Sequence, residues 1–156
     1  MTGLFGETLL GRFSAIRGTE RLGPRMNTNE HGYEKRDLDE VVEGVIGAAF
    51  EVSNMLGCGF LEKVYERALT RELAARGLAA ESQVGYPVNY KGHCVGEYAA
   101  DLLVEKRLLV ELKCVDRLSN EHVAQCINYL KASRLGLAPL INFQRAKVEW
   151  KRVIHG

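Results

Sequence analysis

One short stretch, residues 101–113 with the sequence DLLVEKRLLVELK, constrains the fold of this chain most tightly. Two runs of branched apolar residues stand on either side of the charged residues 105–107, which is typical of two neighbouring β-strands joined by a solvated turn. Side chains alternate between the two faces of a strand, so Glu111 and Lys113 must share one face. The stretch therefore predicts a β-hairpin that presents an acid and an amine side by side.

The length of the turn decides whether Asp101 joins Glu111 and Lys113. A two-residue turn would pair Asp101 with Val110 and leave Glu111 on the other face of the sheet. A three-residue turn at residues 105–107 sets Asp101 opposite Glu111, with their Cβ atoms about 5 Å apart. We predict the three-residue turn.

Two carboxylates this close repel each other, and when partly buried they need a cation or a shared proton. A divalent metal ion suits them best, because hard oxygen ligands with room for water favour Mg²⁺ or Mn²⁺. Such an ion polarises a phosphate and generates hydroxide from bound water, and Lys113 would orient that water or neutralise charge in the transition state. The alternative is a surface ion pair between Glu111 and Lys113 on an edge strand. The upstream Asp101 and the apolar character of the strand favour the metal site.

The length and composition indicate one folded domain preceded by a tail. The chain has 156 residues, 46% of them hydrophobic, which suffices for one compact core but not comfortably for two. Residues 1–36 are rich in Gly, Arg, Thr, Asn and Glu, so we predict a disordered N-terminal tail and a single domain over residues 37–156. The sequence from Met26 onward resembles a natural beginning, so residues 1–25 need not belong to the natural protein.

The charge balance excludes a strongly basic nucleic-acid-binding protein. The chain has 21 Lys and Arg residues and 20 Asp and Glu residues, so any binding of nucleic acid must come from a local basic patch. A basic rim near the site would be such a patch, and its candidates are Lys131, Arg134, Arg145, Lys147, Lys151 and Arg152. Four scattered cysteines without a Cys-x-x-Cys pair, no apolar run of membrane-spanning length and no signal-peptide core predict a cytoplasmic protein with reduced thiols and no membrane partner.

Hydrophobic spacing and turn residues divide the domain into helices and strands. Apolar residues that recur every three or four positions predict helices over residues 38–55 and 61–76, and a third helix, capped by Ser119 or Asn120, runs to about residue 134. Strands are predicted over residues 81–90, 93–104, 108–114, 137–143 and 148–154. This order of elements predicts an α/β fold of the α+β type, with a mixed central sheet flanked by helices.

The same spacing predicts which face of each helix is buried. In the first helix the apolar face includes Phe50, and in the second it includes Leu61, Val64 and Tyr65. Glu62 lies three residues before Tyr65 and is therefore its neighbour on the helix surface. Taken alone, Glu62 is explained by the preference for acidic residues in the first turn of a helix.

Several motifs in order make the chain resemble a known family. Residues 59–65 match the Gly-x-x-Glu-x-x-Tyr signature of the GxxExxY proteins, a small bacterial group in the PD-(D/E)XK nuclease superfamily. Asp101, followed by Glu111 and Lys113, fits the Asp…Glu-x-Lys motif of that superfamily. Because chance readily supplies a single Glu-x-Lys, the ordered set is much more specific than any one motif.

Two further motifs lie in the last part of the chain. Gln125 and Tyr129 resemble the superfamily's Gln-x-x-x-Tyr helix motif, and residues 140–143 resemble its closing strand, so the likeness extends over roughly residues 38–154. Two positions depart from the pattern: Ser53 stands where the group often has His, and Cys58 where it often has Pro.

The resemblance implies a restriction-endonuclease-like αβββαβ core that carries a metal site. Asp101, Glu111 and the backbone carbonyl of Leu112 would hold Mg²⁺ or Mn²⁺. Glu62, on the helix before the sheet, would complete the metal shell or support it from behind. Lys113 would assist the attacking water.

The resemblance also assigns roles to the third helix and to the protein as a whole. Gln125 and Tyr129 would position the lysine or a substrate phosphate.

The expected activity is metal-dependent hydrolysis of phosphodiester bonds, in DNA rather than RNA. The alternative is a catalytically silent nuclease fold that binds nucleic acid or a protein partner, because the small size leaves little surface for recognising a target. A purely structural cluster of Asp101, Glu111 and Lys113 fits their charge types least. The oligomeric state is open, with a homodimer as one option.

Overall fold

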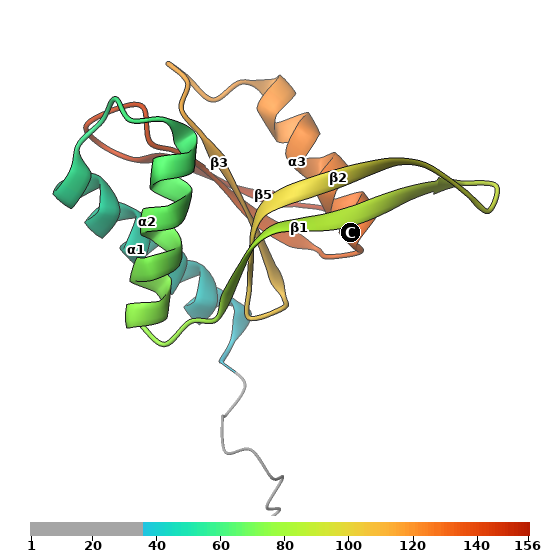
Figure 1. Ribbon diagram of the computed structural model, residues 1–156, viewed down its shortest axis with the longest axis horizontal. Helices are drawn as coiled ribbons and strands as arrows, with labels where there is room; N and C mark the ends of the chain where they lie inside the picture. Colours follow the sequence, from blue (N-terminus) through green and yellow to red (C-terminus); the bar gives the residue numbers. More distant parts are fainter. Residues whose placement is uncertain (1–35) are drawn as a thin grey trace, which may run out of the picture. The chain divides into compact units, whose positions relative to one another are not determined.

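A five-stranded mixed sheet forms the centre of the fold in the computed structural model, which describes residues 36–156 (Figure 1). All neighbouring strands are antiparallel except β3 and β4, which run parallel and are connected through helix α3 (Asn120–Ser133). The strands, in their spatial order, are β1 (Ala80–Tyr90), β2 (His93–Val104), β3 (Leu108–Lys113), β4 (Leu137–Asn142) and β5 (Glu149–Ile154). The predicted α+β class with a mixed sheet is confirmed. The tail predicted for residues 1–36 lies, up to residue 35, outside the described residues.

Helices α1 (Leu38–Leu56) and α2 (Glu62–Ala75) cover one face of the sheet. The Asp37 side chain caps α1 by accepting a hydrogen bond of 2.7 Å from the Leu38 N–H. The core between these helices and the sheet includes Val41, Val45, Ala49, Leu69, Leu73, Leu102, Val104, Leu108, Val110 and Leu112. Among the described helices, none is long and apolar enough to cross a membrane.

Helix α3 covers the opposite face of the sheet (Figure 1). Ser119 caps it, because its side chain accepts the His122 N–H while its own N–H donates to His122 Nδ1 at 3.0 Å. The second core, between α3 and the sheet, consists of Ala100, Leu109, Leu118, Cys126, Tyr129, Leu130, Ala138, Leu140 and Val153. Since side chains alternate along β3, Glu111 and Lys113 share the α3 face with Leu109.

The turn between β2 and β3 has the predicted three residues. Val104 pairs with Leu108, which leaves residues 105–107 as the loop. Pairing between the two strands ends at Leu102 and Val110, directly before Asp101 on β2 and Glu111 on β3. The predicted turn length is therefore confirmed.

Three of the residues predicted to be buried on the helices are exposed. Leu61 is 79% exposed, Val64 37% and Phe50 36%, so these predictions are wrong. Leu61 is the N-cap residue of α2 and lies outside the helix. The buried apolar residues of α2 stand four apart and form a narrow line: Tyr65, Leu69 and Leu73. Hydrophobic spacing identifies an apolar stripe, but it does not show how much of that stripe the neighbouring elements cover.

Strands β1 and β2 form a long hairpin that extends beyond the rest of the sheet (Figure 1). They pair from Tyr90 and His93 at the tip to Ala80 and Val104 at the base, whereas β2 pairs with β3 only over its last three residues. The outer part of this hairpin, residues 86–98, is called the arm below.

Candidate functional site

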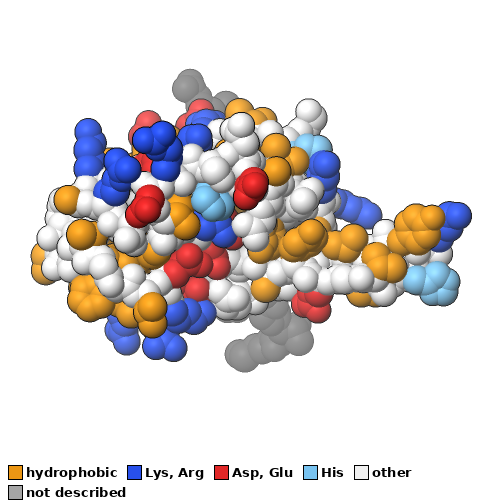
Figure 2. Space-filling model, turned by 90° about the horizontal axis from the view of Figure 1, so that it is seen from above, with side chains coloured by type: hydrophobic (Ala, Val, Ile, Leu, Met, Phe, Trp, Pro, Cys, Tyr) orange, Lys and Arg blue, Asp and Glu red, His pale blue; other side chains and the backbone are white. Residues whose placement is uncertain are grey.

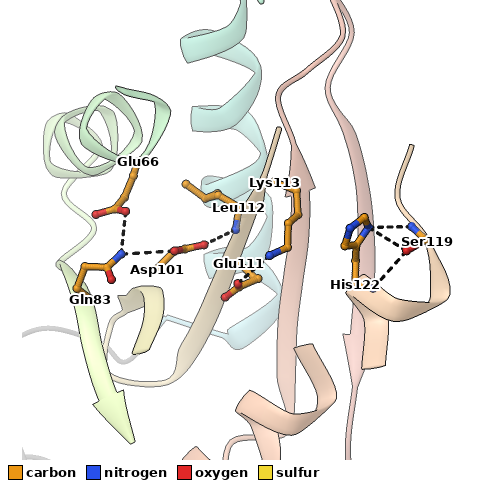
Figure 3. A network of polar contacts seen from close by, with 8 residues as sticks. All are labelled: Glu66, Gln83, Asp101, Glu111, Leu112, Lys113, Ser119 and His122. Carbon is orange, nitrogen blue, oxygen red and sulfur yellow. Dashed lines mark hydrogen bonds and ion pairs between the residues drawn. The ribbon is translucent and has the colours of Figure 1, made fainter. Parts of the chain in front are cut away.

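Asp101 and Glu111 lie where β2 and β3 separate (Figure 3). Backbone pairing between the two strands reaches Leu102 and Val110. Beyond that pair, the Leu112 N–H donates a hydrogen bond of 2.8 Å to Oδ2 of Asp101. A carboxylate thus takes the place of the backbone acceptor that a continuing β2 would supply.

The Leu112 carbonyl, which is predicted to be a metal ligand, faces the same side of β3 as the Leu112 N–H. In a β-strand the N–H and C=O of one residue point toward the same neighbouring strand. The next carbonyl, that of Lys113, correspondingly faces β4 and accepts the Phe143 N–H at 2.9 Å. The Leu112 carbonyl is therefore directed toward β2, the strand that carries Asp101.

Glu111 and Lys113 lie side by side on the α3 face of β3 (Figure 3). Lys113 Nζ is 3.5 Å from Oε1 of Glu111, and the two side chains are 15% and 6% exposed. The pair is therefore not the surface ion pair considered as the alternative from sequence. Groups this deeply buried have lost most of their hydration, so their charges depend strongly on their neighbours.

Burial raises the pKa values of the carboxyl groups at this site. The pKa of Glu111 rises to about 8, first because burial disfavours the ionised form and then because of Asp101, while Lys113 lowers it. The pKa of Asp101 is also raised, chiefly by burial, although the hydrogen bond from the Leu112 N–H lowers it. Carboxyl groups with raised pKa values need a nearby cation if they are to be ionised together at neutral pH.

Glu62, the first residue of α2, belongs to the same acidic cluster. The backbone of Cys114, the residue directly after Lys113, lowers the pKa of its carboxyl group. Burial and then Asp101 raise the pKa of Glu62, and Lys113 lowers it. The structure therefore brings Glu62 to the end of β3, beside the other acids.

Tyr65, the last residue of the Gly-x-x-Glu-x-x-Tyr signature, fixes the loop before Glu62. Its side chain is fully buried and stacks on Phe143 with the ring centroids 4.7 Å apart. Its hydroxyl donates to the Gly57 carbonyl at 2.7 Å and accepts the Phe60 N–H at 3.3 Å. Tyr65 thus holds the loop from which α2 begins, and with it Glu62.

Gln125 and Tyr129 lie next to each other on α3. Burial, then Glu111 and Asp101, raise the pKa of Tyr129 to about 12, while Gln125 lowers it. The ring of Tyr129 meets the ring of Tyr98 edge to face, with 5.0 Å between centroids. The helix motif therefore lies within the electrostatic field of the two acids.

Two polar residues at this cluster were not predicted from sequence. Glu66 is 4% exposed and pairs with Lys63 at 2.7 Å. The Gln83 amide nitrogen donates to Oε2 of Glu66 at 2.9 Å and to Oδ1 of Asp101 at 3.4 Å. Glu66 stands four residues after Glu62, a spacing that puts both on one helix face and could have identified it. Gln83 carries no such signal.

Asn142, at the end of the predicted closing strand, holds the segment that follows Lys113. It is 1% exposed, and its side chain bonds both backbone groups of Val115, accepting the N–H at 3.0 Å and donating to the carbonyl at 2.6 Å. It also donates to Glu149 at 3.2 Å. Asn142 therefore fixes the exit of β3 into the loop before α3.

The donor chemistry of the cluster fits a hard divalent cation. Carboxylate oxygens and a backbone carbonyl are the ligands that Mg²⁺ and Mn²⁺ prefer. Within residues 36–156, no group of three or more His, Cys, Asp or Glu side chains is arranged to hold a metal ion. This finding leaves open a site made of Asp101, Glu111 and the Leu112 carbonyl, which has only two side-chain ligands. Glu62, predicted to complete or support the metal shell, is not grouped with both acids as a third carboxylate ligand.

The candidates for a basic rim do not line one cleft. Lys131 and Arg134 line a cleft together with Tyr98 and other residues of the arm. Arg145 and Lys147 line a separate pocket. The predicted rim is therefore divided into at least two cationic regions.

Figure 2 shows acidic side chains gathered in the middle of one face of the molecule, with Lys and Arg side chains on both sides of them. One of the predicted rim residues, Arg152, is engaged elsewhere, because its guanidinium is 2.6 Å from the carboxylate of Asp39 on α1.

Comparison with known proteins identifies the family. The sequence pattern of the PD-(D/E)XK nuclease superfamily matches residues 39–153. No curated protein matches the chain significantly. The solved structure titled "Crystal structure of SSO0001" is similar over 75% of this chain, with 19% sequence identity and a TM-score of 0.48, and the chain spans 58% of that protein's length. The mixed sheet with three helices agrees with a restriction-endonuclease-like fold. The chain therefore belongs to the PD-(D/E)XK nuclease superfamily.

Proposed function

We propose that this chain is a metal-dependent nuclease that hydrolyses phosphodiester bonds in DNA. The observation that supports this most is the proximity of Asp101, Glu111 and Lys113: Asp101 accepts the Leu112 N–H where β2 and β3 separate, and Glu111 and Lys113 pair on either side of Leu112. The raised pKa values of the two acids favour this proposal, because a divalent cation would stabilise both in their ionised form. Divalent metals are typical of PD-(D/E)XK nucleases.

The proposed ligands of Mg²⁺ or Mn²⁺ are Asp101, Glu111 and the Leu112 carbonyl, with Glu62 completing or supporting the metal shell. When bound, the ion would polarise a phosphate oxygen and lower the pKa of a water molecule. Lys113, beside Glu111, would orient the attacking water and neutralise the negative charge that develops on the phosphate.

The proposed role of α3 is to position the substrate or the lysine. Gln125, through its side-chain amide, would contact Lys113 or a substrate phosphate. Because its pKa is raised to about 12, Tyr129 stays a neutral phenol at physiological pH and would act as a hydrogen-bond donor.

We also propose that the chain belongs to the GxxExxY group. Its signature residues each have a structural reason to be where they are. Gly59 has a φ of 101°, in the region that favours glycine. Tyr65 holds the loop before α2, and Glu62 joins the acidic cluster.

The proposed DNA strand would approach through the cleft between the arm and α3. This cleft is lined by the cations Lys131 and Arg134 and by the amides Asn89 and Asn128, which can bind phosphate oxygens, and by no acidic side chain. Its remaining lining includes Tyr98, whose ring contacts Tyr129 of the candidate site. A strand in the cleft would therefore lead toward the acids.

The second candidate function is a nuclease fold without turnover that binds nucleic acid or a protein partner. Two observations favour it. The described side chains contain no three-residue acidic, histidine or cysteine group arranged for a metal, and Lys113 already pairs with Glu111. In this reading the ammonium group replaces the metal as the partner of the buried carboxylate.

A cleavage screen tests the proposal. Linear, branched and single-stranded DNA and RNA are incubated with Mg²⁺, with Mn²⁺ or with chelator, beside the Lys113→Ala variant. We expect metal-dependent cleavage of DNA that the variant loses. A wild-type protein that is inert on every substrate would reject the nuclease, and Mn²⁺ titration of wild type and Glu111→Ala would then show whether the metal site exists at all.

A further inference from the structure

A continuous series of polar contacts links α2 to β3 through the side chain of Gln83 (Figure 3). Lys63 Nζ lies 2.7 Å from Oε1 of Glu66, and Oε2 of Glu66 accepts the Gln83 amide N–H at 2.9 Å. The same amide nitrogen donates to Oδ1 of Asp101 at 3.4 Å, while Oδ2 of Asp101 accepts the Leu112 N–H. Both oxygens of Asp101 are thus held, one by the amide of β1 and the other by the backbone of β3.

The chemistry of the amide suits this position. A primary amide nitrogen carries two hydrogens, so it can donate to Glu66 and to Asp101 at the same time. It is neutral, and it therefore bridges two carboxylates without adding the repulsion of a third acid or the strong attraction of a cation. A lysine at the same place would compete with a metal ion for Asp101, and Gln83 does not.

The backbone of Gln83 is in a rare conformation. Its φ is 55°, although it lies inside β1 between the paired residues Ser82 and Val84. The left-handed region is unfavourable for a residue with a Cβ atom and persists when the surrounding contacts require it. Gln83 is exposed and has no partner in the register of β1 and β2, and its side chain bonds Glu66 and Asp101 from this conformation.

Glu66 provides a fixed anchor for this bridge. It is 4% exposed, and each of its oxygens has a partner, Lys63 on one side and Gln83 on the other. It stands on the buried line of α2, one turn after Glu62. An acceptor this constrained holds the Gln83 amide in place, and through it the orientation of the Asp101 carboxylate.

We infer that Gln83 is a positioning residue: anchored on Glu66, it orients Asp101 for metal binding. The inference rests on the proposed metal-dependent function and goes beyond it by assigning a residue outside the superfamily's motifs. Gln83 contacts neither the metal nor the reacting atoms. Gln83 would reduce the conformational entropy that the Asp101 side chain loses on binding the ion, because the carboxylate is already oriented.

The test compares two substitutions that tolerate the left-handed backbone and remove the bridge. Gln83→Asn keeps an amide but is shorter by one methylene group, and Gln83→Gly removes the side chain. Ser82→Ala, an exposed neighbour on the same strand, is the matched control. Mn²⁺ affinity is measured by calorimetry, thermal unfolding by circular dichroism without metal, and cleavage by kcat and KM separately.

We expect Gln83→Asn and Gln83→Gly to bind Mn²⁺ about 10- to 100-fold more weakly than wild type at a temperature well below the melting temperature of every variant, with a lower kcat and little change in KM. The Ser82→Ala control should behave as wild type. Equal Mn²⁺ affinity in wild type and both variants would overturn the inference, as would a fall in the melting temperature of both variants that accounts for their weaker binding.

The outcomes for the inference and for the proposed function can be distinguished. A wild type that binds Mn²⁺ and cleaves, beside Gln83 variants that bind it equally well, rejects only the role of Gln83. A wild type that binds Mn²⁺ more tightly than the Gln83 variants but cleaves nothing supports the positioning role and rejects the nuclease. A wild type that binds no Mn²⁺ rejects both.

Discussion

The protonation of a single buried residue, Glu111, should be visible in the stability of the whole protein. Its pKa rises from the model-compound value of 4.5 to about 8 in the metal-free fold. Between these two pH values the folded protein binds a proton that the unfolded chain has released. Stability is therefore highest below the unfolded pKa and falls as the pH rises through the folded pKa.

We expect the melting temperature of the metal-free protein to fall between about pH 5 and pH 8, at roughly 2–4 °C for each kcal/mol lost. Glu111→Gln, which cannot ionise, should flatten this dependence. Added Mn²⁺ should restore stability at the upper end, because the ion replaces the proton. A melting temperature that stays constant or rises over this range would contradict the raised pKa of Glu111.

Residue-scale features divide into those that the sequence reveals and those that it hides. Glu62 and Glu66 are four apart on one helix, so the second acid could have been found from the first. Gln83 could not, because its left-handed backbone is a tertiary effect at a residue type that rarely adopts it. The sequence also could not show that Glu111 and Lys113 are nearly buried, since burial depends on where α3 packs.

At the scale of the elements, the loop between α1 and α2 depends on the Tyr65 hydroxyl. We expect Tyr65→Phe to destabilise the protein by about 1–3 kcal/mol in urea unfolding, because the Gly57 carbonyl and the Phe60 N–H lose their partner. Tyr90→Phe, on the tip of the arm and 62% exposed, is the control and should have no effect. Equal stability of the two variants would show that the hydroxyl does not hold the loop.

The turn between β2 and β3 gives a second prediction for an element. Lys106 is exposed and has a φ of 55°, so Lys106→Gly should relieve backbone strain and stabilise the protein by about 0.5–1 kcal/mol. Arg107→Gly should do the reverse, because Arg107 donates a hydrogen bond of 2.7 Å to the Arg36 carbonyl. Urea unfolding of both variants measures the difference, and a destabilised Lys106→Gly would refute the argument.

The helices and strands could be predicted because hydrophobic spacing and turn residues indicated the same boundaries. The apolar runs on either side of residues 105–107 predicted the two strands, and of the two turn lengths that they allowed, the structure has the predicted three residues. The exposed Leu61 and Val64 were missed for a physical reason: helical spacing describes the helix alone, and the width of its buried face depends on the elements packed against it.

At the scale of the whole molecule, the cleft between the arm and α3 predicts how nucleic-acid binding depends on salt. Combining Lys131→Ala with Arg134→Gly should weaken binding and reduce the slope of log K against log[salt] by up to about 1.8 for duplex DNA. Gly is chosen at position 134 because Arg134 has a φ of 61°. Arg71→Ala, an exposed cation on α2, is the control, and an unchanged slope in the double variant would show that DNA does not use this cleft.

The near-zero net charge of the chain does not reveal this local arrangement of charges. A chain with 21 basic and 20 acidic residues has no net field, yet the fold gathers acids at the end of β3 and leaves cations beside them. The positions of the cations relative to the acids depend on how the chain folds after α3. The sequence alone does not give those positions. The family resemblance suggested the chemistry that we propose, and the fold was needed to place its surroundings.

The arm and Asp101 belong to one strand. β2 begins at the tip, crosses the cleft beside α3 and reaches Asp101 just before it joins β3. The strand is paired with β1 along the arm and with β3 only over its last three residues, so Asp101 stands where β2 passes from one partner strand to two. A displacement of the arm would be transmitted along this single strand to the position of Asp101.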